Sequence, residues 1–242
     1  MSNPLRFQLA HTPADAAVIS RVFDEVWSVK SMVSPEIIVA SIHNGAYGSV
    51  VWDGDRPIGA AFAIVGKSLS QDAAHLNLHS HAAGVVASHA GQGIGAQLKM
   101  HQWQWARTNG FATITWSFDP LVRRNAWFNM IKLGARVTNY YQNFYGELDD
   151  GINAGEQSDR VLVRWDVSAE EKPKSFALIE PQENDLTIAT PSDIEQLRKI
   201  DKANAQQWRT EQRVAFESAM NNGYFVRGLN ADYSYVLSKG QK

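Results

Sequence analysis

Residues 85–98 have the sequence Val-Val-Ala-Ser-His-Ala-Gly-Gln-Gly-Ile-Gly-Ala-Gln-Leu, and this stretch decides the fold. It predicts a strand, a glycine-dense turn over residues 91–95 and a helix that begins near Ala96. Glycines adopt positive φ easily and let main-chain N–H groups approach a ligand closely. The first N–H groups of a helix have no acceptor within the helix, so they form an anion site. The stretch therefore predicts a binding site for a phosphate-bearing cofactor.

One helix and three strands are predicted before this turn. Residues 12–30 begin with Thr-Pro-Ala-Asp, which supplies a capping hydroxyl, a proline for the first turn and an acidic residue. Two β-type runs, residues 48–52 and 57–65, flank Asp53-Gly54-Asp55-Arg56, a strong hairpin signal. The apolar run over residues 75–87 predicts a third strand that leads directly into the glycine turn.

After the turn, helices and strands alternate as far as a polar, proline-containing stretch at residues 168–175, which predicts a linker. Beyond it the sequence predicts a short strand, a helical segment with a break near Asp201 and a terminal strand pair. The predicted organisation is one domain over residues 1–167 and a C-terminal extension over residues 168–242. The elements expected after the turn are helix 96–108, strand 113–118, helix 123–133, strands 140–148 and 160–167, strand 186–189, helix 195–222, and strands 224–228 and 233–237.

Composition excludes several classes of function. The 242 residues contain 23 Lys and Arg against 25 Asp and Glu, without a basic cluster, so a nucleic-acid partner is not expected. The chain has no cysteine, which excludes disulfides, thiolate metal sites and a cysteine nucleophile. No basic start precedes an apolar run, and no stretch approaches about 18 apolar residues, so we expect a cytoplasmic protein without a membrane segment.

The glycine turn is compatible with a dinucleotide as the cofactor. Gly91-x-Gly93-x-x-Ala96 fits the Gly-x-Gly-x-x-Gly/Ala fingerprint, and Asp119 closes the next strand, where a carboxylate could bind a ribose. However, Asp119 lies further along than the ~20 residues typical of that arrangement. A hairpin and a third strand also precede the turn, whereas the fingerprint normally opens a βαβ unit. A Rossmann-type NAD(P) oxidoreductase is therefore one alternative.

The order of elements, together with two motifs, resembles the GNAT family of acyl-CoA-dependent N-acyltransferases. The main motif of that family is Arg/Gln-x-x-Gly-x-Gly/Ala, and Gly93-Ile94-Gly95 supplies its glycine half. Residues 125–135 resemble a later family segment, a short helix that ends in Leu-Gly. The resemblance covers about residues 5–167, and it is closest to a large, uncharacterised subgroup of predicted acyltransferases. The stretches that carry this narrower resemblance are Trp116-Ser-Phe-Asp-Pro, Asn125-Ala126, Phe144-Tyr145-Gly146 and Ser158-Asp159-Arg160.

This resemblance implies an α/β (α+β) fold with a mixed, mostly antiparallel twisted sheet flanked by helices, followed by a C-terminal αβ extension. It also implies that acyl-CoA binds along the third strand and the glycine turn. A backbone N–H near Val85 would polarise the thioester, and Asn125 would bond a pantetheine amide. The implied cofactor-binding residues are Ala83, Val85, Val86, Gly91, Gln92, Gly93, Ile94, Gly95 and Asn125.

Two positions depart from the family pattern. Ala90 stands where the family has Arg or Gln, so CoA would be held by backbone amides, helped by Gln92 or Lys99. Met130 stands where many members have a tyrosine that protonates the departing thiolate. The acid must then come from elsewhere, with Tyr145 as a candidate, or be water.

His79 and His81 are the candidate bases for removing a proton from the acceptor amine. They alternate with Ala83 and Val85, which predicts that all four side chains share one face of the strand. An unperturbed histidine pKa of about 6.5 suits proton transfer near neutral pH. The alternative is that both are hydrogen-bonded histidines without a catalytic role. A third ligand with metal-site spacing is missing, so no metal is expected.

Together these observations predict transfer of an acyl group, acetyl or succinyl, from acyl-CoA to a small amine or amino acid. The amine would attack the thioester directly while both substrates are bound. A non-catalytic CoA- or nucleotide-binding protein is the alternative that Ala90 and Met130 favour. The loop over residues 151–159 is a candidate acceptor-side loop, and a homodimer contact through the extension stays open.

Overall fold

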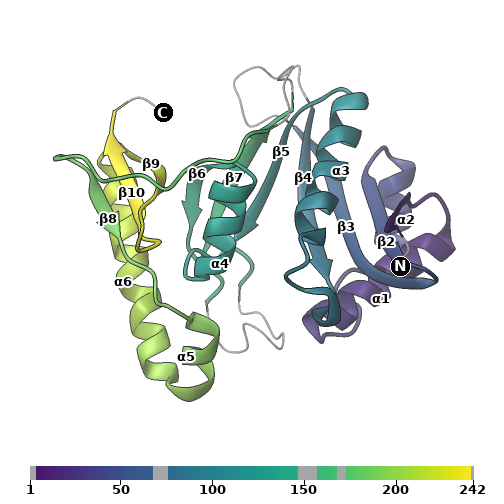
Figure 1. The fold of residues 1–242 in the computed structure, drawn as a ribbon, viewed down its shortest axis with the longest axis horizontal. Helices are drawn as coiled ribbons and strands as arrows, with labels where there is room; N and C mark the ends of the chain where they lie inside the picture. The colour runs from purple at the N-terminus through teal and green to yellow at the C-terminus, as the bar shows by residue number, and fades with distance from the viewer. Residues whose placement is uncertain (1–3, 68–75, 147–156, 168–172, 241–242) are drawn as a thin grey trace. The chain divides into compact units, whose positions relative to one another are not determined.

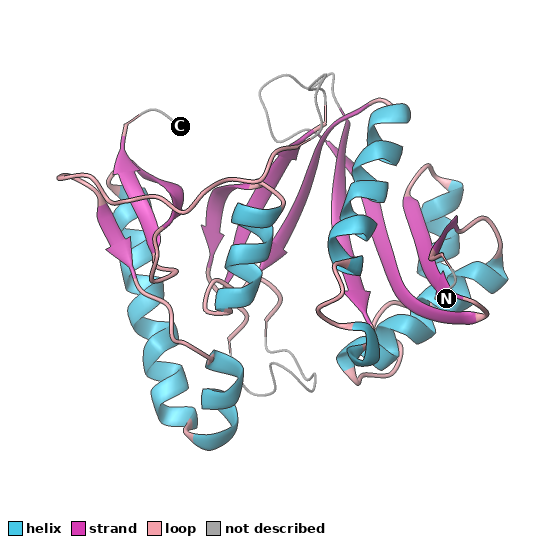
Figure 2. Ribbon diagram, viewed as in Figure 1, coloured by secondary structure: helices cyan, strands magenta, loops and turns pink. Residues whose placement is uncertain are grey.

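The computed structural model describes residues 4–67, 76–146, 157–167 and 173–240 (Figure 1). Contacts divide the chain into two compact units, of which the first comprises residues 1–116 and 166–170. The second comprises residues 117–165 and 171–242. Helices and strands occur in both units (Figure 2), which confirms the predicted α/β class. The predicted boundary after Val167 stays a prediction.

The first unit holds a five-stranded sheet in the order β1-β2-β3-β4-β5. All neighbouring strands are antiparallel except β4 and β5, which are parallel, so the sheet is mixed and mostly antiparallel as predicted. The predicted hairpin at residues 53–56 joins β2 to β3. The elements are β1 (Arg6–Leu9), α1 (Pro13–Trp27), α2 (Pro35–His43), β2 (Tyr47–Asp53), β3 (Arg56–Lys67), β4 (Leu76–Val85), η1 (Ala87–His89), α3 (Ile94–Thr108) and β5 (Phe111–Phe118), whose last two residues fall in the second unit.

Helices cover both faces of this sheet. Helix α1 begins with the predicted cap, because Thr12 and Asp15 form a reciprocal capping box. Together, α1 and α2 bury one face of β2, β3 and β4 in a cluster that includes Ile19, Phe23, Ile38, Val50, Phe62 and Ala82. A Cβ on Gly84 would lie 2.8 Å from Val26 of α1, so glycine permits this close packing. The opposite face carries α3, whose Lys99 donates a hydrogen bond to Ser80 of β4.

The second unit contains an antiparallel pair, β6 with β7, and a three-stranded antiparallel sheet in the order β8-β10-β9. The predicted break near Asp201 is confirmed, because Asp201 ends α5 and caps α6. The predicted strand 140–148 is wrong over residues 142–146, since β6 ends at Tyr141 and Asn143 has a positive φ that turns the chain, and residues 147–148 lie outside the described ranges. The elements are α4 (Arg123–Ala126), the π-helical turn η2 (Trp127–Lys132), β6 (Arg136–Tyr141), β7 (Arg160–Asp166), β8 (Leu186–Ile188), α5 (Ile194–Ile200), α6 (Lys202–Asn221), β9 (Tyr224–Leu229) and β10 (Tyr235–Lys239).

Buried ion pairs join the C-terminal helices to residues 117–165. Arg209 of α6 binds Asp119 with two hydrogen bonds, of 2.8 and 2.6 Å, and Arg198 of α5 adds a third of 2.6 Å. One turn further along α6, Arg213 binds the buried Asp159 through two bonds of 2.8 Å. These pairs explain why residues 171–242 cluster with residues 117–165 rather than forming a separate body.

Electrostatics show that the Asp119 carboxylate is held in its charged form. Burial alone would raise the pKa of Asp119, but the guanidinium groups of Arg209 and Arg198 hold that pKa well below its ordinary value. This carboxylate therefore stabilises the fold above the pKa of an unfolded aspartate, about 3.9, and the stabilisation is lost as the pH falls below it.

Replacing Asp119 by Asn is expected to lower the free energy of unfolding by about 3–5 kcal/mol, because two buried guanidinium groups lose their carboxylate. Urea denaturation followed by circular dichroism measures this change. The matched control is Arg124→Ala, which removes an exposed ion pair of 2.8 Å with Glu195 and should cost less than about 1 kcal/mol. Equal losses in the two variants would contradict a stabilising role for the buried cluster.

Candidate functional site

The glycine turn has the predicted strand–turn–helix geometry. Strand β4 ends at Val85, the short helix η1 follows, and α3 begins at Ile94, two residues earlier than expected. Gly91 and Gly93 have φ angles of 77° and 78°, which a residue with a side chain would adopt only with strain. Gly93 is the N-cap residue of α3, and no side chain caps this end of the helix.

Main-chain N–H groups of residues 91–95 have no acceptor within the part of the chain that the structure describes. Just before them, Ala90 donates to the carbonyl oxygen of Ala87, and just after them Ala96 and Gln97 both donate to that of Gly93, at 3.2 Å. Residues 91–93 are exposed. A row of free amides at the positive end of a 15-residue helix is suited to bind a phosphate or another anion.

Strand β4 leaves its partner β5 halfway along its length. Their parallel pairing runs from Leu76 to His79 of β4 and ends there, opposite Thr115, although β4 continues to Val85. On the other edge, the amide of Val86 donates to Ile58 of β3 at 2.9 Å. In an antiparallel ladder the hydrogen-bonded pairs alternate, so the N–H of Val85 points away from β3, toward the edge that β5 has left. The amide of Val86 is thus engaged by β3, whereas that of Val85 has no strand partner among the described residues.

A β-bulge at His81 changes which side chains share a face of β4. Ala82 pairs with Phe62 of β3, but the next residue of β3, Ala63, pairs with Ser80, so His81 is the extra residue. His79 pairs with Ile64, which shares the face of Phe62 and of the α1 and α2 core. The prediction that the two histidines share a face with Ala83 and Val85 is therefore wrong. Paired with Ala61 and Gly59, those two residues lie on the opposite face.

His79 is half-buried, and its Nδ1 lies 3.2 Å from the hydroxyl of Thr115. Burial, helped by the nearby His81 and Lys99, lowers the pKa of His79 to about 4. His81 has more access to solvent and stands edge-on to the Phe62 ring, 6.3 Å away between centroids. Partial burial still lowers the pKa of His81. The expected value near 6.5 is thus wrong for His79, which is neutral at pH 7 and a weak base.

Two predicted site residues belong to the second unit. Asn125 lies on α4, where its main-chain N–H donates to the carbonyl oxygen of Val122 at 2.9 Å. Tyr145 is exposed, with its hydroxyl 3.1 Å from that of Ser117 and its ring 5.6 Å from the guanidinium carbon of Arg160. Most of the candidate acceptor-side loop 151–159, like most of the linker 168–175 and the start of the strand predicted at His75, lies outside the described residues.

The predicted helper role of Lys99 at the glycine turn is wrong. Its side chain is 4% exposed and its Nζ donates to the Ser80 hydroxyl at 3.0 Å and to Gln102 at 2.8 Å, on the sheet side of α3. The helix periodicity indicates this burial, because Lys99 falls on the same face of α3 as Leu98 and Trp103, which are both buried.

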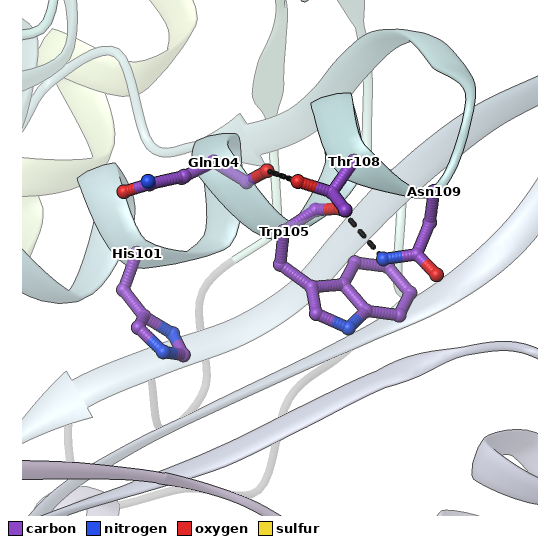
Figure 3. A pocket seen from close by; sticks show the side chains of 5 residues that line it. All are labelled: His101, Gln104, Trp105, Thr108 and Asn109. Carbon is purple, nitrogen blue, oxygen red and sulfur yellow. Dashed lines mark hydrogen bonds between the residues drawn. The ribbon is translucent and has the colours of Figure 1, made fainter.

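A groove of about 340 Å³ flanks the C-terminal half of α3 (Figure 3). Three of its polar side chains are already bonded within the protein: Asn109 and Thr108 donate to helix carbonyls, and His101 contacts the Tyr47 hydroxyl at 2.7 Å. It lies at the other end of α3 from the glycine turn, so we assign it no role. The residues that line it are His101, Gln104, Trp105, Thr108 and Asn109.

Among the described residues, no group of three or more potential ligands is placed to hold a metal ion. Within the same ranges, no helix has the length and apolar character needed to cross a membrane.

No family model and no curated protein sequence matches this chain. Solved structures do. Naa50 from Arabidopsis thaliana, in complex with the bisubstrate analogue CoA-Ac-MVNAL, aligns with a TM-score of 0.53 and 16% identity, covering 66% of this chain and 97% of its own. The ribosomal-protein-S18-alanine N-acetyltransferase from Escherichia coli gives 0.52 and 15%, covering 72% and 100%. An acetyltransferase of the GNAT family from Streptococcus pneumoniae gives 0.51 and 12%, covering 67% and 98%.

The chain therefore has the GNAT fold, which confirms the resemblance inferred from its sequence. This fold is not the doubly wound parallel sheet that the dinucleotide alternative requires. Asp119, the residue considered for ribose binding, is also occupied, because Arg209 and Arg198 bind both of its carboxylate oxygens. The Rossmann alternative is wrong on both counts.

The lowered pKa of His79 predicts a loss of stability in mild acid. An unfolded histidine takes up its proton near pH 6.5, whereas folded His79 takes it up only near pH 4, so stability falls as the pH drops between these values. Urea titrations at pH 7.0 and 4.5 give the loss in the free energy of unfolding between these two pH values. This loss should be about 2 kcal/mol larger in wild type than in His79→Gln. His43→Gln, at an exposed histidine, is the control. The same loss in wild type and His79→Gln would contradict the assignment.

Proposed function

We propose that the chain is an acyl-CoA-dependent N-acyltransferase that moves an acetyl or succinyl group to a small amine or amino acid. The observation that carries this proposal is the row of free amides at residues 91–95, next to a β4 edge that has lost its partner strand. The first feature suits a diphosphate, and the second suits a chain of amide groups such as pantetheine. Both features lie within one unit of a GNAT fold.

In this proposal the CoA diphosphate is bound by backbone rather than by a side chain. Ala90 offers no donor, so the amides of residues 91–95 supply the hydrogen bonds and α3 supplies the positive dipole end. The pantetheine arm then follows β4, where the N–H of Val85 is free to bond the thioester oxygen. A fixed N–H at that position stabilises the oxyanion that forms when the carbonyl is attacked.

The reaction would be a direct acyl transfer. A neutral amine nitrogen attacks the thioester carbon, the C–N bond forms and the C–S bond breaks. The nitrogen loses a proton to His79 or His81, both of which are neutral at pH 7 and able to accept one. The thiolate takes a proton from water. Tyr145, in the second unit, stays the acid predicted from the sequence in place of the tyrosine that Met130 replaces.

A non-catalytic CoA-binding protein is the second candidate. Met130 stands where many family members have the acidic tyrosine, and its thioether has no proton to donate; the side chain is buried. A protein of this kind would keep the amide row and bind CoA without turnover.

Two measurements separate these candidates. CoA should raise the melting temperature of the purified protein by several degrees, because a ligand that binds only the folded state stabilises it, whereas NAD should not. Free thiol should then be released from acetyl-CoA or succinyl-CoA when a panel of amines and amino acids is added. Binding without thiol release would leave the non-catalytic candidate. Stabilisation by NAD and not by CoA would reject both.

Gln92→Glu should weaken CoA binding about 5–10-fold without destabilising the fold. The new carboxylate lies beside the free amides, where it repels a diphosphate yet interacts favourably with the helix dipole. Isothermal titration calorimetry gives the dissociation constant, and thermal melts without ligand give the stability. Gln104→Glu makes the same exposed change near the other end of α3 and should leave affinity unaltered. Equal effects of both variants would rule out diphosphate binding at the turn.

A further inference from the structure

The ammonium group of Lys99 lies at the point where β4 and β5 part. The last paired residues are His79 and Thr115, and the next residue on each strand is Ser80 and Trp116. Lys99 contacts both of these: its Nζ donates to the Ser80 hydroxyl at 3.0 Å and lies 3.8 Å from the centre of the Trp116 ring. A single side chain of α3 therefore connects the two strands directly beyond the end of their ladder.

This charge is buried without a carboxylate. Lys99 is 4% exposed, and its third contact within the described ranges is the side-chain oxygen of Gln102, at 2.8 Å. Burying an ammonium group without a counter-ion is costly, and an apolar side chain of similar volume would fill the same space more cheaply. The attraction between a desolvated cation and a tryptophan face is correspondingly strong. A lysine at this position is therefore better explained by its contacts with Trp116 and Ser80 than by a gain in stability.

We propose that Lys99 is a positioning residue for acyl-CoA, whose ammonium group keeps β4 and β5 apart beyond His79 and Thr115. The inference rests on the proposed function, because the edge of β4 that it keeps open is the edge assigned to the pantetheine arm. Without the cation, the Trp116 ring loses its contact with Lys99, and β5 is held less firmly away from that edge. The main-chain groups of β4 would then be satisfied by β5 rather than by the cofactor.

Lys99 also makes this opening sensitive to pH. Burial lowers the pKa of Lys99 to about 7, so the charge is lost just above neutral pH. The neutral amine can still donate to Gln102, but it no longer attracts the Trp116 ring. The titratable groups nearby are His79 and His81 of β4, whose lowered pKa values place their titration below this range. Gln102 on α3 and Trp116 on β5 do not titrate.

The test is calorimetric titration of CoA into the full-length protein at pH 6.0 and pH 8.5. Wild type should bind about 5–10-fold more weakly at pH 8.5, the equivalent of losing one cation–ring contact. Lys99→Arg keeps its charge at both pH values, so its affinity should change less than that of wild type. Lys99→Met should bind CoA weakly at both pH values, with an affinity close to that of wild type at pH 8.5. Lys30→Met, at an exposed lysine, should behave as wild type.

The outcomes distinguish this inference from the proposed function. If wild type binds no CoA at either pH, the proposed function fails and the role of Lys99 fails with it. If wild type binds CoA but Lys99→Met matches its affinity at both pH values, only the role of Lys99 is overturned. Should Lys99→Met not fold, Lys99→Arg decides: a pH dependence equal to that of wild type overturns the inference. A wild-type affinity that is flat across this range overturns it too.

Discussion

Backbone groups that have lost their partners determine what the first unit can do. A main-chain N–H removed from its partner must find another acceptor or remain in water. In this chain two such sets arise next to each other in sequence: the β4 edge beyond His79, and the amides of residues 91–95. The bulge at His81 lies on the strand that carries the first set, and the positive φ angles of Gly91 and Gly93 shape the turn that carries the second. In the function that we propose, these two sets bind the two ends of one long ligand, its phosphate end and its amide-containing arm.

The second unit is held together by ion pairs as well as by apolar packing. Arg209 and Arg213, one turn apart on α6, each bind a buried carboxylate, Asp119 or Asp159, from residues 117–165. Tyr140 adds its hydroxyl to Asp159 and stacks its ring on Phe216. Burial and this carboxylate raise the pKa of Tyr140, and its hydroxyl already donates to Asp159. Tyr140 is therefore not available as an acid. Tyr145, by contrast, is exposed, and its hydroxyl lies 3.1 Å from that of Ser117.

Local signals predicted most elements, and tertiary effects account for the misses. The capping box at Thr12, the hairpin at residues 53–56 and the glycine turn each have a short-range physical cause, so the sequence predicted them correctly. Helix α2 carried the same kind of signal, Ser34 before Pro35, and was overlooked. The bulge at His81 has no local signature. It depends on how β3 and β4 pair, and a single extra residue reversed the face predicted for Ala83 and Val85.

His79 and Lys99 lie near each other, and neither has a carboxylate partner among the described residues. A base near neutral pKa usually needs an acidic neighbour to stabilise its charged form, and His79 instead has His81 and Lys99 nearby. The positive charge of Lys99 makes protonation of His79 less favourable, and it would equally oppose an ammonium acceptor near this strand. An amine that arrives already neutral, or that loses its proton to water first, avoids this cost. For the reaction that we propose, this charge would favour weakly basic acceptors over strongly basic ones, since the former are neutral at pH 7.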